Sequence, residues 1–164
     1  MKKGRKMEHV TAFKAAIASV MAILTALWGW FGWLVLAWII CMGIDWTTGT
    51  VCANLTGTWS SKAAREGAAH KGGSIITVIT ACVLDMVIGL FLGAIPGLAL
   101  PFDYSVALSP LVIAWYILTE MGSIIENVGK MGAPIPPWLA AAIEALHDGV
   151  DSTGEKIAVD KKEK

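Results

Sequence analysis

The stretch MGIDWTTGTVCANLTG, residues 42–57, interrupts a long apolar run with an aspartate, four threonines and an asparagine. The run begins near residue 13, so a membrane helix would be expected to continue through this stretch. If this stretch is a helix, one of its faces consists of polar and small residues, namely Asp45, Thr48, Gly49, Cys52 and Thr56. Only a narrow strip of such a helix suits lipid, and we therefore expect most of its surface to face protein or water.

The composition of the 164-residue chain indicates an integral membrane protein. The mean hydropathy is +0.63, and 55% of the residues are hydrophobic but only 16% are charged, unlike a soluble domain of this length. The eight tryptophans suit membrane interfaces. The three cysteines lie in apolar runs without CxxC spacing, and the three histidines have no partners at metal-ligand spacing. We therefore expect no disulfide, no metal site and no cofactor.

The apolar segments predict an all-α integral membrane protein with about four transmembrane helices. If residues 13–44 formed one helix, it would be about 48 Å long, against a hydrocarbon core of about 30 Å. A glycine-containing, tryptophan-rich turn at 28–33 is therefore expected to divide this run, which makes the first span short. The predicted spans are 13–28, 31–55, 74–95 and 110–128.

The spans form a transmembrane domain at 13–131, preceded by a basic head at 1–12. A proline-rich link and a short amphipathic helix are expected at 132–148. The last segment, 149–164, is rich in charged residues and is expected to be a disordered tail.

The distribution of basic residues predicts the orientation of the chain. All 13 lysines and arginines lie in three groups, 1–14, 60–71 and 130–164, whereas the loops at 28–33 and 96–109 have none. Under the positive-inside rule these groups face the cytoplasm. An even number of crossings must then separate successive groups. Four spans satisfy this condition, with the N- and C-termini both cytoplasmic.

The third and fourth predicted spans also carry carboxylates on faces of small or polar residues. These faces comprise Asp85, Gly89 and Gly93, and Glu120, Ser123, Glu126 and Asn127. A charge near the bilayer centre costs about 2.5–3.5 kcal/mol. Because the predicted spans contain no lysine or arginine, the acids are expected to be protonated, to hydrogen-bond across helices to serines and threonines, or to contact water. The faces are either plain helix contacts or a polar interior or oligomeric interface, and three such spans favour the second.

The polar segment 56–73 has two interpretations. It is either an ordinary cytoplasmic loop or a basic surface helix that contacts anionic lipid. Its candidate contact residues are Ser60, Ser61, Lys62, Arg65 and Lys71. No catalytic motif occurs in the sequence, so we do not expect an enzyme.

Several motifs carry a resemblance to a known family. IDWTTG at 44–49 is followed by SSK at 60–62, by LD in the third span and by WYILTEMGSIIENVGKMGAPIP at 115–136. In this order and spacing the motifs resemble phage holins of the toxin-secretion/phage-lysis type over about residues 29–137. The last motif is the most specific.

The resemblance implies a multi-pass protein of the bacterial inner (cytoplasmic) membrane that homo-oligomerises into large non-selective pores. Its partners would be further copies and the lipid bilayer, with an endolysin or a toxin as cargo that need not be bound directly, and no nucleic acid. The polar faces would then control assembly or line the lumen. The residues concerned are Asp45, Thr48, Gly49, Cys52, Thr56, Asp85, Gly89, Gly93, Glu120, Ser123, Glu126 and Asn127. The alternative role of Glu126 is an ion pair with Lys130.

Two other interpretations stay open. A small selective ion channel or proton-coupled transporter would use the acids as a relay, although the halves of the chain show no inverted repeat. A membrane anchor would recruit a soluble partner through 137–164. In addition, Met7 offers an alternative start that would remove four basic residues, against the simpler interpretation of these residues as a cytoplasmic anchor.

Overall fold

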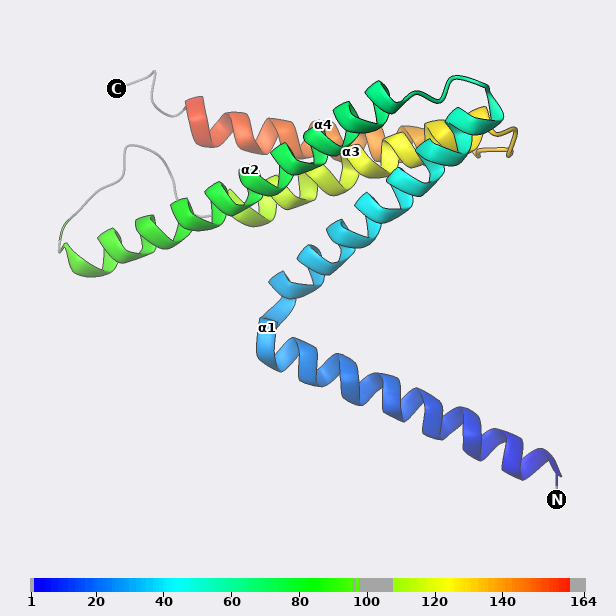
Figure 1. Cartoon of the computed structure of the whole chain (residues 1–164). Helices are drawn as coiled ribbons and strands as arrows, with labels where there is room; N and C mark the ends of the chain where they lie inside the picture. Colours follow the sequence, from blue (N-terminus) through cyan, green and yellow to red (C-terminus); the bar gives the residue numbers. More distant parts are fainter. Residues whose placement is uncertain (1, 96, 98–107, 160–164) are drawn as a thin grey trace. The chain divides into compact units, whose positions relative to one another are not determined.

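The computed structural model is all-α, as the sequence predicts, and describes residues 2–95, 97 and 108–159 (Figure 1). No strand occurs in these residues. The helices are α1 (Lys2–Leu55), α2 (Ser61–Ala94), α3 (Leu108–Lys130) and α4 (Pro137–Val159). Residues Met1–Leu36 and Ala37–Lys164 form two separate compact units.

α1 consists of two helical segments separated by one non-helical residue, Gly29. Its backbone angles, φ 61° and ψ −167°, lie in a region that is essentially restricted to glycine. The Trp33 indole Nε1 donates to the Thr25 hydroxyl over 2.7 Å, which links the segments on either side of Gly29. The turn expected within 28–33 is therefore reduced to a single residue.

Replacing Gly29 with alanine is expected to straighten this part of α1. A Cβ strains the observed backbone angles by about 1–3 kcal/mol, and a regular helix removes that strain. Spin labels at the exposed positions Met21 and Leu36 measure the change by electron paramagnetic resonance. A continuous helix separates their backbones by about 22 Å, and we expect a shorter distance in the parent chain. Equal distances in both proteins would contradict this prediction; Gly43→Ala, at a helical glycine, is the control.

Three helical segments are long and apolar enough to cross a membrane: Gly29–Leu55, Ser61–Ala94 and Leu108–Lys130. They overlap the second, third and fourth predicted spans, and their crossing of the membrane stays a prediction. The expected first span, 13–28, falls on residues whose side chains lie largely outside the described part of the chain. This span, the cytoplasmic orientation of the termini and the alternative start at Met7 stay predictions.

α2 begins well before the predicted span at 74–95. The side chain of Ser60 caps its N-terminus by accepting a backbone N–H over 3.1 Å. Residues 61–73 are therefore helical and not a loop, and form the first turns of α2; their cytoplasmic location stays a prediction. With 34 residues, α2 is about 51 Å long, so it must tilt or extend beyond a bilayer core of about 30 Å.

α4 corrects the prediction of a short helix that ends at residue 148. Residues 149–159 are helical instead of disordered, and 160–164 lie outside the described residues. The residues buried or half-buried along one face of α4 include Leu139, Ile143, His147, Val150, Gly154 and Ile157. Packing of this face against α3 stabilises the helix, although the glycine, serine and threonine in 149–154 have low helix propensity.

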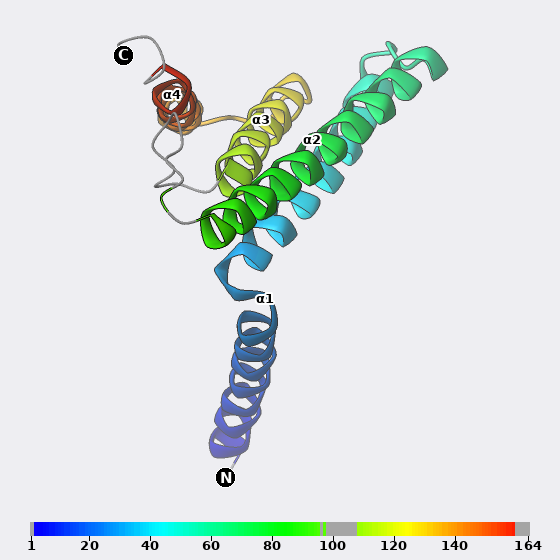
Figure 2. The ribbon, with the colours of Figure 1, turned by 90° about the vertical axis from the view of Figure 1, so that its left-hand side faces the viewer.

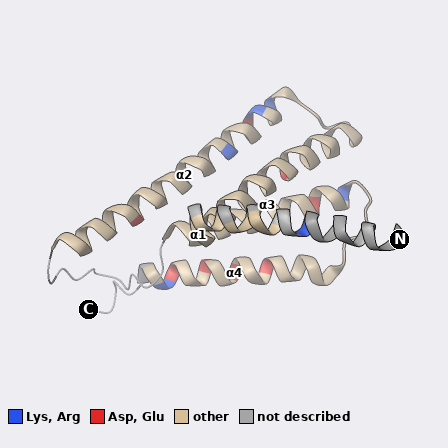
Figure 3. Ribbon diagram, turned by 90° about the horizontal axis from the view of Figure 1, so that it is seen from below, with Lys and Arg blue, Asp and Glu red and all other residues tan. Residues whose placement is uncertain are grey.

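In residues 37–164, α2 and α3 lie side by side, and α4 lies along α3 (Figures 1 and 2). The outer faces of α1 and α2 expose large apolar side chains, which suits contact with lipid. These include Ile40, Trp46, Ile76, Ile79 and Leu90. The basic side chains of α2 are confined to its first half, whereas α4 carries several acidic ones (Figure 3). The fold therefore combines apolar spans with one strongly acidic helix.

Candidate functional site: a buried charge cluster

A charge cluster joins three candidate membrane helices through Lys71. Its Nζ donates to Asp45 Oδ2 at 2.9 Å and to Glu120 Oε2 at 2.6 Å. The side chains of Lys71, Asp45 and Glu120 are only 21%, 16% and 10% exposed. Asp45 belongs to α1, Lys71 to α2 and Glu120 to α3, so one ammonium group links all three helices.

Asn127 of α3 completes the cluster beside Asp45. Its Nδ2 donates to Asp45 Oδ1 at 3.3 Å. A Cβ on Gly49 would lie 3.5 Å from the same amide nitrogen, which places this turn of α1 directly beside Asn127. Each carboxylate oxygen of Asp45 therefore accepts a hydrogen bond, one from α2 and one from α3.

The cluster contains two carboxylates and one ammonium group, which leaves one negative charge in excess when all three are ionised. Buried charges are tolerated when they are paired and hydrogen-bonded, and removing one partner of a buried pair costs about 3–5 kcal/mol. A cavity of about 290 Å³ adjoins the cluster, and its lining includes Asp45, Lys71, Ser123 and Asn127. Water that enters this cavity would reach the excess charge directly.

Lys71 has partners that the sequence did not predict. It is expected either in a cytoplasmic loop or in a surface helix that contacts lipid, and the acids of the spans are expected to have no basic partner. In the structure, Lys71 of α2 forms ion pairs with Asp45 and Glu120. The sequence contains a signal for this position. Lys71 continues the three- and four-residue spacing of the buried α2 residues, Ser74, Val78, Ala81 and Ile88.

The threonines around Asp45 hydrogen-bond within their own helix and not across helices to acids. Four threonine hydroxyls donate to backbone carbonyls three or four residues earlier, those of Thr47, Thr48, Thr50 and Thr56. On the predicted polar face of α1, Cys52 is buried, Thr48 and Gly49 are half-buried and Thr56 is exposed. Most of this face therefore turns toward other helices of the same chain.

Asp85 forms a second polar contact between helices, because it caps the N-terminus of α3. The backbone N–H groups of Leu108 and Ser109 donate to its two oxygens at 2.8 and 2.7 Å, and the Ser109 hydroxyl donates at 2.6 Å. A carboxylate is favourable there because the first N–H groups of a helix lack intrahelical partners and the helix dipole is positive at this end. The expected hydrogen bond from a serine to a span acid is present here.

The other predicted site residues belong neither to the charge cluster nor to the Asp85 cap. No atom lies within 4 Å of a Cβ built on Gly89 or Gly93, so no described segment of the same chain packs closely there. Glu126 forms an exposed ion pair with Lys130 at 2.6 Å, the simpler of its two expected roles. The roles proposed for these residues in assembly or in the lumen stay predictions.

The remaining basic residues of the first turns of α2 are exposed. Lys62 pairs with Glu66 at 3.8 Å, and Ser61 and Arg65 are exposed. Within the described part of the chain, no group of three or more His, Cys, Asp or Glu side chains could hold a metal ion. The charge cluster is therefore the strongest candidate for a functional site.

Comparisons with known proteins relate the chain to one family. A model of the bacteriophage holin family matches residues 22–148, which include the three candidate spans and the whole charge cluster. An uncharacterized protein of Halalkalibacterium halodurans is 29% identical over 140 residues, which cover 85% of this chain and 96% of the relative. No solved structure matches the chain.

Proposed function

The chain belongs to the bacteriophage holin family, and from this we propose that its copies assemble in the bacterial cytoplasmic membrane into large non-selective lesions. These lesions let an endolysin reach the cell wall, or a large toxin leave the cell, without direct binding of the cargo. The family is one of membrane pore-forming proteins and not of enzymes. The family match across all three candidate spans is the observation that carries the proposal.

The charge cluster supports a role in delaying assembly. Asp45, Lys71 and Glu120 satisfy one another within one chain, so their charges need not face lipid while copies are dispersed. Assembly then brings the cluster, through the cavity beside it, within reach of water or of a second copy. Asp45 and Glu120 accordingly set the time at which lesions form.

The second half of α2 supports the contact between copies. Gly89 and Gly93 lie on an exposed face, and small residues let helix backbones approach closely in membranes. Large apolar side chains beside them, such as Leu90 and Phe91, are also exposed. This face is the self-association surface of the proposal.

Inducible expression in a bacterium that carries a folded cytoplasmic reporter enzyme tests the proposal. Membrane potential and reporter release are followed together. We expect abrupt release of the whole enzyme after a delay, and we expect Asp45→Leu to change the delay because it leaves Lys71 with one carboxylate less. Glu66→Gln, at an exposed position, should leave the delay unchanged. Loss of potential without release of protein would contradict the proposal and indicate a small selective channel.

A further inference from the structure

α4 is held along α3 by a polar contact that we name the α3–α4 latch, formed by Trp115 and Thr119 of α3 and His147 and Asp151 of α4. The Trp115 indole Nε1 donates to Asp151 Oδ1 at 2.8 Å. Asp151 Oδ2 lies 3.1 Å from His147 Nδ1, and His147 Nε2 lies 3.3 Å from the Thr119 hydroxyl. The latch therefore contacts α3 in the middle of a candidate membrane span.

The contact between these helices extends along most of α3. Toward its C-terminal end, Leu118 and Ile125 line one cavity together with Ala140 and Ile143 of α4. Near its N-terminal end, a Cβ on Gly154 would lie 3.8 Å from Leu111 Cδ2. α4 consequently runs antiparallel to α3, beside the part of α3 that crosses the membrane.

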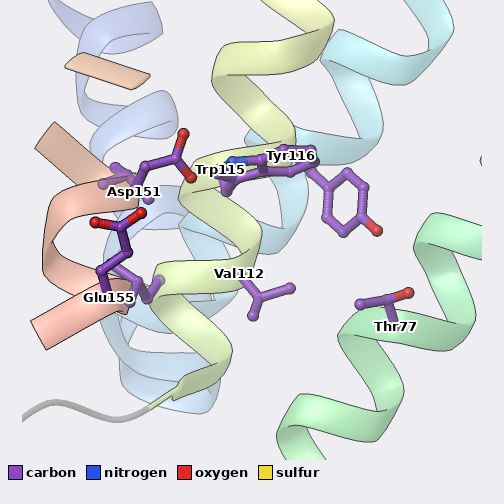
Figure 4. Close-up of a pocket in the computed structure, with 9 residues that line it drawn as sticks. Thr77, Val112, Trp115, Tyr116, Asp151 and Glu155 are labelled. Carbon is purple, nitrogen blue, oxygen red and sulfur yellow. Dashed lines mark hydrogen bonds between the residues drawn. The ribbon is translucent and has the colours of Figure 1, made fainter. Parts of the chain in front are cut away.

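One side of α4 is acidic from residue 144 to residue 155. Carboxylates follow one another at three- or four-residue spacing: Glu144, Asp148, Asp151 and Glu155. These residues line two cavities between α4 and α3, of about 290 and 450 Å³. In the larger cavity, Asp151 and Glu155 lie across from Thr77 of α2 (Figure 4). The acidic side of α4 thus borders a groove over the spanning helices.

Lipid does not suit this arrangement. α4 is not among the described helices that are apolar enough to span a membrane. Ionised carboxylates at membrane depth are rare, because they must be paired or must face water. A dispersed chain surrounded by lipid cannot meet this condition along the whole acidic side, whereas a chain that borders a water-filled lesion can.

We propose that α4 docks on α3 when copies assemble around water, and that its acidic side then faces the lumen. Before assembly α4 lies on the membrane surface, where the apolar face that later contacts α3, with Ile143 and Val150, rests against the bilayer. This inference rests on the proposed function and adds the element that moves. The latch residues hold α4 in its docked position.

Cross-linking at two protein densities tests the inference. Leu111→Cys with Gly154→Cys, in a chain whose native cysteines are replaced by alanine, is reconstituted in vesicles at low and at high protein-to-lipid ratio. We expect the yield of the intramolecular cross-link, formed by a short thiol reagent, to rise severalfold at high density. Adding Trp115→Phe, which removes the indole donor to Asp151, should reduce that yield.

A matched cysteine pair controls for reactivity and folding. Met42→Cys with Ser74→Cys joins α1 to α2, where the parent side chains lie 3.8 Å apart, and does not depend on α4. Its yield should be equal at both densities. Equal yields for the α3–α4 pair at both densities would overturn the inference. Enclosed folded reporter separates the two claims: its retention at high density would contradict the proposed function, whereas its release with a density-independent α3–α4 yield would contradict only the docking of α4.

Discussion

Replacing Lys71 with methionine is expected to lower the free energy of unfolding by about 3–5 kcal/mol, because it leaves two largely buried carboxylates without their shared cation. The aliphatic part of the side chain is retained, so the loss reflects charge and hydrogen bonding more than packing. Thermal unfolding of the purified protein in detergent, at equal detergent concentration, measures the difference. Poor accumulation of the variant in membranes would have the same cause.

Two further proteins control this prediction. Lys62→Met removes a basic residue of the same helix whose side chain is 81% exposed, and the stability should change by no more than about 1 kcal/mol. Adding Asp45→Asn and Glu120→Gln to Lys71→Met removes the unpaired charges and should restore most of the stability. A Lys71→Met protein that unfolds at the temperature of the parent would show that the ion pairs do not form in the folded chain.

Replacing Asp85 with alanine is expected to cost about 2–4 kcal/mol, because the first turn of α3 loses its carboxylate cap and three hydrogen bonds. The loss of stability should be largest at the N-terminus of α3, which Asp85 caps. We expect faster amide hydrogen exchange at the first residues of α3, from Leu108 onward, while the exchange of α4 changes less.

Asp85→Asn provides the graded comparison. The asparagine side chain keeps one oxygen acceptor but loses the charge, so its cost should be smaller than that of alanine. Glu66→Gln, an exposed acid earlier in α2, should leave the exchange of α3 unchanged. Unchanged exchange at Leu108 and Ser109 in Asp85→Ala would rule out the capping role.

The spans were predictable because hydropathy and length suffice to define them. The second, third and fourth predicted spans match candidate spans of the structure, and the interruption near Gly29 follows from the length limit of the bilayer core. The extent of α2 was not predictable in the same way. Residues 61–73 are rich in glycine, alanine and charged side chains, which are typical of a loop between spans, although they continue the helix.

The groups that pair with the acids could not be predicted from the sequence. Helical periodicity identifies which residues share a face, as for Asp45 with Gly49, but it does not say which helix that face meets. Lys71 lies 26 positions from Asp45 and 49 from Glu120, so only the packing of three helices brings them together. α4 shows the same limit, since contact with α3 overrides the weak propensity of its second half.

The delay before release of a folded reporter, measured at matched membrane levels of protein, tests the central claim most directly. The claim is that the Lys71 cluster lets single chains stay dispersed in lipid, because it pairs their buried charges. Lys71→Met leaves the carboxylates in need of water or a second copy, so it should release the reporter earlier than the parent. Adding Asp45→Asn and Glu120→Gln should return the delay toward that of the parent. If Lys71→Met released the reporter on the parent schedule, the cluster would have no part in the timing of lesions.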